Sequence, residues 1–205
     1  MIFQKDLFGR NLIGWRKKWI LLKVVDSAIA DEMIISNHYS GKATSNRFLS
    51  MGVYHVDNKD KLLGCVQLGS GIRPKIKHTW GNDATPENSV EFDRMWLSDE
   101  LPKYSETIVL SALAKYLNKQ YLKLKYILTY SDGTVGNTGT IYKAGNYVEC
   151  GKIKADFYIL KNGERIHPVT MWHRHKSRAW DLIEKIYPNI SKAEGFQYRF
   201  IYKLR

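Results

Sequence analysis

The sequence predicts an α/β fold in which a central sheet is flanked by helices. Two observations support this: short apolar and β-branched runs alternate with helical patterns, and one buried run ends in a glycine-rich loop. The chain has 205 residues, of which 44% are hydrophobic, so it is long enough to bury a sizeable core. We therefore expect a single domain over residues 1–205, with a core over about 19–171 and a basic C-terminal extension over 172–205.

The first half of the chain follows the order strand, helix, hairpin, strand, helix. The first helix has a capping residue at Asp26 or Ser27, and the second has Ser105 as its natural N-cap, followed by apolar residues at a period of 3.6. A polar segment over residues 57–61 separates two apolar runs, which indicates a hairpin. The expected strands span residues 19–25, 48–56, 62–68 and 89–97.

The stretch from Tyr126 to Gly151 organises the second half. A buried strand, Tyr126–Tyr130, is followed by a loop with three glycines, where the backbone can bend sharply and approach a ligand. Thr138 or Thr140 can cap a short helix that carries Tyr142. Asp132 and Tyr142 are then placed at the carboxyl end of a sheet, where open α/β sheets bind ligands. The alternative is that Asp132 only caps a turn and Tyr142 only packs on the sheet.

The last third of the chain predicts further strands and one short helix. Asn162-Gly163 is the strongest short hairpin signal of the sequence. The expected elements are strands over residues 147–150, 156–161, 165–171 and 197–204 and a helix over residues 179–186.

The net charge of +12 is distributed unevenly. Residues 1–50 carry 8 basic and 4 acidic side chains, residues 51–150 carry 12 and 11, and residues 151–205 carry 12 and 5. A surplus at the two ends favours a polyanionic partner, with nucleic acid first. The cluster from Trp172 to Arg178 strengthens this, because it mixes cations with an aromatic ring and a hydroxyl, which contact phosphates and bases. The alternative is a solvated basic surface without a partner.

Two loops and one strand carry unexpected polar residues. The loop His38–Lys42 holds an imidazole, a phenol, a hydroxyl and an ammonium, and is either functional or an ordinary helix exit. Residues 69–88 predict a long loop, which we expect to face the substrate; a disordered surface loop is the alternative. Its basic and aromatic residues are Arg73, Lys75, Lys77, His78 and Trp80. Arg94 lies among apolar neighbours, and arginine is rarely buried unless it is paired or used.

The two cysteines and the hydropathy pattern indicate a compartment. Cys65 and Cys150 both fall inside expected strands, so they are expected to be buried free thiols in a reducing cytosol. We expect no signal peptide, because charged residues interrupt the opening of the chain, and no membrane span, because no apolar run reaches 18 residues.

Several blocks of residues are shared with one known family. The blocks are His38-Tyr39-Ser40-Gly41-Lys42, Glu91-Phe92-Asp93-Arg94-Met95, Ser98-Asp99-Glu100-Leu101-Pro102, Ser131-Asp132-Gly133 and Gly139-Thr140-Ile141-Tyr142. Together they resemble the phage Mom proteins over roughly residues 20–170, within the GNAT acyltransferase superfamily. The resemblance implies a GNAT-like fold with a central mixed, mostly antiparallel twisted sheet. One departure is the loop Leu101–Ser105, which has no glycine, whereas the pyrophosphate loop of acyltransferases is usually glycine-rich.

The resemblance also implies an activity. Mom proteins convert the N6 amine of adenine in DNA to a methylcarbamoyl derivative, which protects phage DNA from host restriction enzymes. It further implies acetyl-CoA and a bound iron as cofactors, and double-stranded DNA and an acyl-CoA as partners in the cytoplasm of the bacterial host. Two other classes stay open: a GNAT-like N-acetyltransferase acting on a protein or small amine, and a non-catalytic nucleic-acid-binding protein. A homodimer is a further possibility.

The candidate catalytic residues are Tyr39, Arg94, Asp132 and Tyr142. Asp132 would take a proton from the adenine amine or bind a metal, and Arg94 would hold Asp132 ionised or stabilise an oxyanion. Tyr142 would protonate the leaving thiolate, and Tyr39 would act as a proton shuttle or metal ligand.

Three further groups of residues are candidate binding sites. The free amides at the helix start, over Ser105, Glu106 and Thr107, can hold a phosphate of the acyl-CoA. An imidazole, a phenolate and a carboxylate suit iron by ligand type, so the candidate ligands are His38, Tyr39 and Asp132. The candidate DNA-binding residues are Lys42, Arg73, Lys75, Lys77, Arg174, Lys176 and Arg178, and Trp80 and Trp96 are candidates for stacking on a flipped adenine.

Overall fold

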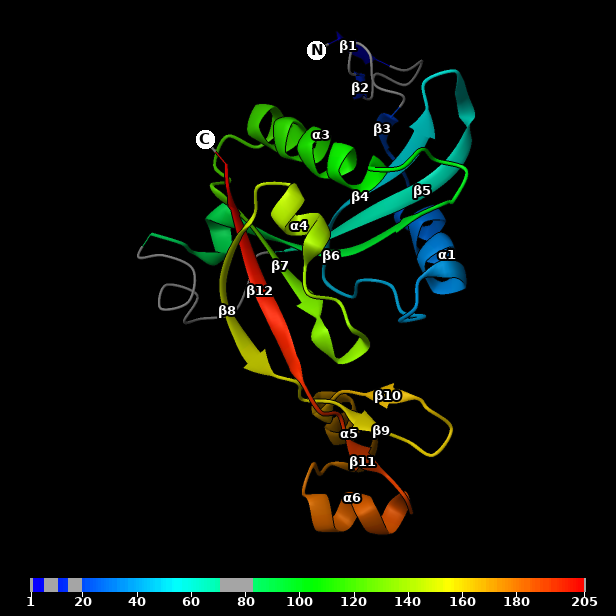
Figure 1. The fold of residues 1–205 in the computed structure, drawn as a ribbon, viewed down its shortest axis with the longest axis vertical. Coiled ribbons are helices and arrows are strands. Elements are labelled where there is room, and N and C mark those ends of the chain that lie inside the picture. Colours follow the sequence, from blue (N-terminus) through cyan, green and yellow to red (C-terminus); the bar gives the residue numbers. More distant parts are fainter. Residues whose placement is uncertain (1, 6–10, 15–19, 71–82, 205) are drawn as a thin grey trace. The chain divides into compact units, whose positions relative to one another are not determined.

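The computed structural model describes residues 2–5, 11–14, 20–70 and 83–204 (Figure 1). The chain forms two compact units. The first unit comprises residues 1–130, 139–150 and 199–205, and the second comprises residues 131–138 and 151–198. Each unit is described by itself. The expectation of one domain with a basic extension stays a prediction, and residues 172–198 belong to the same unit as residues 151–171.

A nine-stranded sheet has the order β1-β2-β3-β4-β5-β6-β7-β12-β8. Its strands are β1 (Ile2–Lys5), β2 (Asn11–Gly14), β3 (Ile20–Val24), β4 (Arg47–His55), β5 (Asn58–Ser70), β6 (Ser89–Leu97), β7 (Tyr126–Asp132), β8 (Val148–Lys154) and β12 (Phe196–Lys203). The pairs from β1 to β6 are antiparallel, and β6 pairs with β7 in parallel. This confirms the expected α/β class with a mixed, mostly antiparallel sheet.

Among the described residues, the first unit has three α-helices: α1 (Ser27–Asn37), α3 (Ser105–Gln120) and α4 (Thr140–Ala144). The Asp26 carboxylate accepts the amide of Ala28 at 2.8 Å and caps α1, as expected. Ala30 and Ile34 of α1 are fully buried and pack with Cys65 of β5. The apolar face of α3 is buried as its 3.6-residue period predicts. Figure 1 shows α1 and α3 as the two long helices beside the sheet.

Two expectations for the first unit were wrong in detail. The hairpin turn is shorter than residues 57–61, because His55 already pairs with Asn58. The N-cap of α3 is Tyr104, in the left-handed conformation at φ 71°, and Ser105 is the first helical residue. Ser105 is buried, and its hydroxyl donates to the carbonyl of Pro102 at 2.6 Å, so this hydroxyl is not the helix cap.

Strand β6 carries a β-bulge in its middle. On β5, Leu68 pairs with Phe92 and Gln67 pairs with Arg94, so Asp93 is the extra residue. The parallel ladder with β7 runs from Ser89 to Phe92 and does not continue past this point. The two strands therefore diverge at the bulge, as Figure 1 shows. Bulges often redirect side chains beside active sites, so the bulge at Asp93 is a candidate position for a site.

The second unit has its own small core. Three short strands form a sheet of order β10-β9-β11: β9 (Tyr158–Ile159), β10 (Arg165–Ile166) and β11 (Ser191–Lys192). Helices α5 (Pro168–His175) and α6 (Trp180–Ile186) accompany them. The buried residues of this core are Tyr158, Ile166, Met171, Ile183 and Ile190. The second unit therefore has a hydrophobic core of its own.

The expected hairpin around Asn162-Gly163 exists but is short. Arg165 pairs with Ile159 and Ile166 with Tyr158, and Gly163 has a φ of +82°. The expected strand over residues 165–171 was wrong from Pro168 onward, where α5 begins. Proline lacks an N–H and has a fixed φ, so it is well suited to the first position of a helix. The helix over 179–186 and the closing strand over 197–204 are confirmed as α6 and β12.

Candidate active site

Tyr142 lies on the short helix α4, which starts after a tight turn. Its N-cap is Gly139 at φ 79°, not Thr138 or Thr140. A Cβ on Gly139 would lie 2.1 Å from the ring of Phe200, so a larger residue at this position would displace the ring. The Tyr142 ring in turn packs against Phe200, at 5.4 Å between centroids, and against Phe92 at 6.0 Å. The aromatic packing therefore holds Tyr142 beside the bulge of β6.

The Tyr142 hydroxyl contacts a threonine on the neighbouring strand. The Thr129 side chain forms a hydrogen bond with Tyr142, and its hydroxyl donates to the carbonyl of Phe92 at 2.9 Å. The hydrogen bond between Thr129 and Tyr142 lowers the pKa of Tyr142, in opposition to the larger effect of burial. Burial raises the pKa of Tyr142 to about 12, so this phenol keeps its proton at neutral pH. A protonated phenol in this position can act as a proton donor.

Arg94 connects the bulge of β6 to the loop after α1. Its Nε donates to the carbonyl of Lys42 at 3.1 Å, and a terminal nitrogen donates to the carbonyl of Asp93 at 2.7 Å. The guanidinium is permanently charged and lies near several titratable groups. Burial lowers the pKa of His38, and the charge of Arg94 lowers it further. Burial raises the pKa of Tyr142 and of Asp93, and the charge of Arg94 opposes this rise. Arg94 is therefore the electrostatic centre of this cluster.

His38 and Tyr39 reach the same cluster from the loop after α1. Their rings lie 4.3 Å apart, and the Tyr39 side chain is 65% exposed. Burial, and then the charge of Arg94, lower the pKa of His38 to about 4. Tyr39 also lies close enough to raise the pKa of Tyr142. Three of the four expected catalytic residues, Tyr39, Arg94 and Tyr142, thus come together in the first unit.

A buried polar network fixes this loop against β5. Gln67 is fully buried; its Oε1 accepts the amide of Thr44 at 3.1 Å, and its Nε2 donates to Asp31 at 2.6 Å. Arg47 completes the network through an ion pair with Asp31. The sequence analysis missed Gln67, although a lone glutamine inside the apolar run over residues 62–68 is a signal for such a buried bond.

Asp132, the fourth expected catalytic residue, lies in the second unit. Its Oδ1 accepts the amide of Thr134 at 3.0 Å and also the Thr134 hydroxyl. Its Oδ2 pairs with Arg165 at 2.7 Å, and the Arg165 guanidinium lies 5.0 Å from the ring centre of Phe157. The arginine that pairs with Asp132 is therefore Arg165, while Arg94 donates to backbone carbonyls. The sequence analysis missed this partner.

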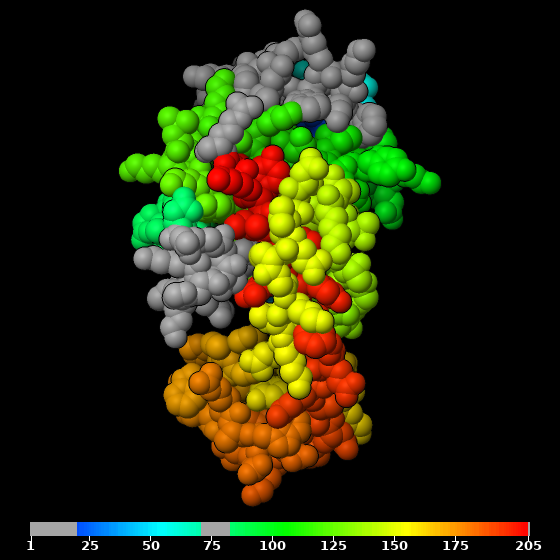
Figure 2. All heavy atoms as spheres, turned by 60° about the vertical axis from the view of Figure 1, so that its left-hand side comes forward, coloured from blue at the N-terminus to red at the C-terminus, as the bar shows by residue number. Residues whose placement is uncertain are grey.

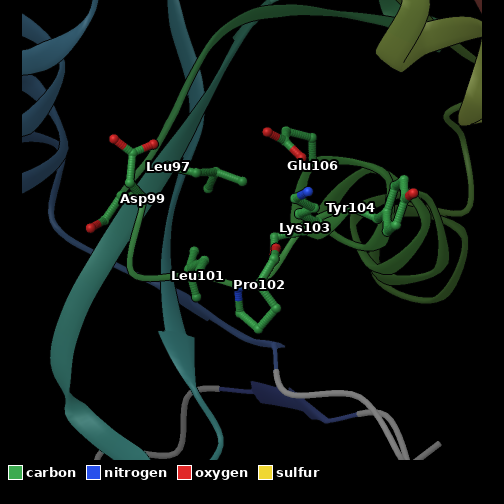
Figure 3. Close-up of a pocket in the computed structure, with 9 residues that line it drawn as sticks. Leu97, Asp99, Leu101, Pro102, Lys103, Tyr104 and Glu106 are labelled. Carbon is green, nitrogen blue, oxygen red and sulfur yellow. The ribbon is translucent and has the colours of Figure 1, made fainter.

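The helix start at α3 faces a hollow of about 410 Å³, lined by residues 97–99 and 101–106. Figure 3 shows Leu97 and Leu101 on one side of it and Glu106 at its edge. The Thr107 hydroxyl donates to the carbonyl of Tyr104 at 2.9 Å, while the first amides of any α-helix have no partner within the helix. The amide of Ser105 donates to the carbonyl of Pro102 at 3.3 Å, so the donors that this helix start can offer a ligand are the amides of Glu106 and Thr107, with the hollow beside Glu106.

The expected iron ligands do not form a metal site in this structure. Both carboxylate oxygens of Asp132 are engaged by Thr134 and Arg165. A metal-bound histidine usually donates its other ring N–H to an acceptor, whereas Nδ1 of His38 accepts the amide of Ser40. Within the described part of the chain, no three His, Cys, Asp or Glu side chains cluster as a metal site would. The hydrogen bonds of Asp132 and of Nδ1 of His38 therefore do not support these residues as iron ligands, and their role in binding iron stays a prediction.

The expected DNA-binding residues are only partly described. Arg73, Lys75, Lys77 and Trp80 lie outside the described residues. Arg174, Lys176 and Arg178 are exposed at the end of α5 and the turn after it, next to Trp172, which is 50% exposed. Residues 168–190, orange in Figure 2, make up one surface region of the second unit. Lys42 is exposed in the loop that the Arg94 side chain contacts.

Comparison with solved structures defines the class of protein. The ribosomal-protein-S5-alanine acetyltransferase of Vibrio fischeri matches with a TM-score of 0.53 and 11% identity, covering 94% of this chain and 97% of that one. The spermidine N-acetyltransferase of Vibrio cholerae, solved with CoA and spermine, matches with a TM-score of 0.51 and 12% identity, covering 91% and 96%. The fold is thus that of the GNAT acetyltransferases.

A family model identifies the group more closely. The chain belongs to the Mom protein family, whose model matches residues 19–205. A relative, methylcarbamoylase mom of Escherichia phage Mu, is 28% identical over 161 residues. The match covers 78% of this chain and 65% of the phage Mu protein, which is just under two thirds of that relative's length. Among the described residues, no helix is long and apolar enough to cross a membrane.

Proposed function

We propose that this chain modifies adenine in phage DNA, attaching a methylcarbamoyl group to the N6 amine and so protecting the DNA from host restriction. Membership of the Mom family, together with the name of the phage Mu relative, supports the reaction. The observation that carries the proposal is the cluster of His38, Arg94, Thr129 and Tyr142 where β6 and β7 diverge. In open α/β sheets, ligands bind beyond the carboxyl ends of the strands.

The residues of this cluster suit an acyl-transfer step. A bound acyl-CoA would supply the carbonyl carbon as a thioester. Tyr142 holds a proton that can pass to the leaving sulfur when the C–S bond breaks and the bond to N6 forms. Arg94 provides a fixed positive charge for the carbonyl oxygen, and Tyr39, on the exposed side, is placed to shuttle a proton. Transfer of a plain acetyl group would give N6-acetyladenine, so this step yields the methylcarbamoyl product only when the transferred acyl group already carries the methylamino nitrogen, as in a methylcarbamoyl thioester.

The amine proton needs a base, and Asp132 stays our candidate for it. In the structure its carboxylate is engaged and oriented by Thr134 and Arg165. The proposed role therefore requires Arg165 to release or share Asp132 when the substrate binds.

The start of α3 is the proposed cofactor site. Amides of Glu106 and Thr107 at the positive end of the helix dipole can bind a phosphate, and the adjacent hollow leaves room for one. Solved neighbours from Bacillus subtilis and Vibrio cholerae contain CoA, which supports an acyl-CoA as the donor. The Bacillus subtilis neighbour has a TM-score of 0.50 and 16% identity, covering 91% of this chain and 98% of that one.

Double-stranded DNA is the proposed substrate and the host cytoplasm the proposed compartment. The exposed cations Arg174, Lys176 and Arg178 can bind phosphates without reading sequence. The target adenine would leave the base stack to reach the cluster, at a cost of a few kcal/mol. Of the two expected stacking residues, Trp96 packs against the buried Ala30 and Ile34, which favours a structural role.

The experiment that tests the proposal is mass analysis of nucleosides from DNA co-expressed with the chain. A methylcarbamoyl adduct on deoxyadenosine is the expected product, and it should disappear in a folded Tyr142→Phe variant. DNA without any modified base would refute the proposal. In that case, acetylation of a protein or small amine would indicate an N-acetyltransferase, and DNA binding alone would indicate a non-catalytic binding protein.

A further inference from the structure

The side-chain amide of Gln67 has its orientation fixed by two partners. Gln67 lies on β5 between Val66 and Leu68, and all three side chains are fully buried. The amide of Thr44 donates to Oε1 at 3.1 Å, and Nε2 donates to Asp31 at 2.6 Å. A backbone N–H needs an acceptor and a carboxylate needs a donor, so the two ends of the amide cannot be exchanged. Gln67 therefore connects the loop after α1 to α1 itself in one arrangement.

The same loop holds the Arg94 guanidinium. Nε of Arg94 donates to the carbonyl of Lys42 at 3.1 Å, and a single residue separates Lys42 from Thr44. Because peptide units are planar and rigid, the position of the Thr44 amide restricts where the Lys42 carbonyl can lie. Gln67 is also directly opposite Arg94 in the ladder between β5 and β6, so both side chains leave the same face of the sheet. The two side chains thus reach this loop at neighbouring points.

A second anchor attaches the end of this loop to β5. The Ser70 amide donates to Oδ1 of Asn46 at 2.8 Å, and Nδ2 of Asn46 donates to the Ser70 carbonyl at 3.2 Å. This anchor lies farther from Lys42 along the chain than Thr44 does. Loss of the Gln67 bond would therefore leave the end of the loop attached and release the part that holds Arg94.

We propose that Gln67 is a positioning residue for adenine modification. Through the Thr44 amide it fixes the Lys42 carbonyl, and through that carbonyl it sets the direction of the Arg94 guanidinium. This role rests on the proposed function, in which Arg94 provides the positive charge for the carbonyl oxygen of the acyl group. A displacement of about 1 Å in such a group can lower a rate by about 10²-fold. Gln67 itself neither contacts the substrate nor moves a proton.

Two substitutions at Gln67 remove the acceptor from the Thr44 amide. Gln67→Met keeps the length of the side chain without its polar atoms, and Gln67→Asn keeps the amide but draws it back by one methylene group. Each should lower kcat by about 10²-fold and leave KM for DNA unchanged, because the misplaced group acts only in the transition state. The matched control is Arg47→Met, which breaks the ion pair with Asp31 and leaves both bonds of Gln67 in place, so kcat should stay at the wild-type value.

A double variant separates positioning from a general structural effect. In an Arg94→Lys background, Gln67→Met should cause no further loss of kcat, because the guanidinium that Gln67 positions is already absent. A structural role would lower kcat by the same factor in both backgrounds. Each variant is first shown to be folded by its thermal transition. If Gln67→Met does not fold, Gln67→Asn gives the same comparison with a polar side chain at this position.

One measurement does not depend on activity. Nitrogen–proton spectra of arginine side chains should contain the Nε–H of Arg94, assigned by its absence in Arg94→Lys. This proton should exchange with water faster in both Gln67 variants than in wild type and Arg47→Met, because its acceptor is no longer fixed. Wild-type kcat in both folded Gln67 variants, equal losses in the two backgrounds, or unchanged exchange would overturn the proposal. If wild-type protein modifies no adenine, the proposed function fails, and the exchange rates still decide whether Gln67 holds Arg94.

Discussion

Replacing Asp132 by Asn tests whether this carboxylate stabilises the second unit. The side chain is 10% exposed, and its partner Arg165 is 26% exposed, so water screens the pair only in part. Asn keeps an oxygen for the Thr134 amide but places an NH₂ group against the guanidinium. A hydrogen bond to a charged group contributes about 1.5–3 kcal/mol, so we expect the free energy of unfolding to fall by about 2 kcal/mol.

The assay is thermal unfolding of the full chain. For a chain of this length, about 2 kcal/mol corresponds to a decrease of about 4–8 °C in Tm. Arg165→Met should destabilise by a similar amount, because it leaves a mostly buried carboxylate without its partner. In the double variant the two effects should not add, and a coupling of about 1–3 kcal/mol is expected for groups in direct contact.

A matched control exists in the same unit. Glu164 and Arg174 are 3.5 Å apart and both are well exposed, so Glu164→Gln should change the free energy of unfolding by less than about 0.5 kcal/mol. The reasoning is refuted if Asp132→Asn has the wild-type Tm. If that variant also loses adenine modification, Asp132 acts in catalysis without stabilising the unit.

Three other predictions concern the site and the charged surface. The folded-state pKa of Tyr142, about 12, exceeds the unfolded value of about 10, so its contribution to stability is complete below about pH 10 and is lost as the pH rises through 12. Tyr142→Phe should therefore lose less stability than wild type over that range in alkaline melts. Arg94→Lys keeps the charge but cannot donate to both carbonyls, so modification should fall by about 10²-fold or more while DNA affinity stays the same. Each alanine replacement of one of three exposed cations should reduce the log–log salt slope of DNA binding by about 0.9. The cations tested are Arg174, Lys176 and Arg178. A flat salt response of wild type would contradict phosphate binding.

Elements with a strong period could be predicted from the sequence. The amphipathic pattern of α3 and the apolar run of β7 both lead to the observed elements, because α3 buries one face and β7 is buried along almost its whole length. The N-cap of α3 could not be predicted, since the Ser105 hydroxyl is taken by the carbonyl of Pro102 and Tyr104 adopts the left-handed conformation. Local preferences rank cap residues, but they do not show which acceptor lies nearby.

The candidate site could also be predicted from the sequence only in part. Arg94 could be recognised as unusual because an arginine stood in an apolar strand, and the structure places it at the centre of the cluster. The pairing of Asp132 with Arg165 could not be recognised, because 33 residues separate the two and only the fold of the second unit brings them together. The β-bulge at Asp93 was also hidden, since it arises from the register between two strands and not from either strand alone.

The second unit leaves the first by β8 and returns by β12, and these two strands are neighbours in the sheet. A segment whose ends lie side by side can be lengthened, shortened or exchanged without altering the register of the strands that carry it. Its core of Tyr158, Ile166 and Met171 is made from its own residues, so such a change need not disturb the packing around Tyr142. Substitutions on the surface of this segment therefore need not alter the cluster around Tyr142, whereas replacing the whole segment would also remove Arg165, the partner of Asp132.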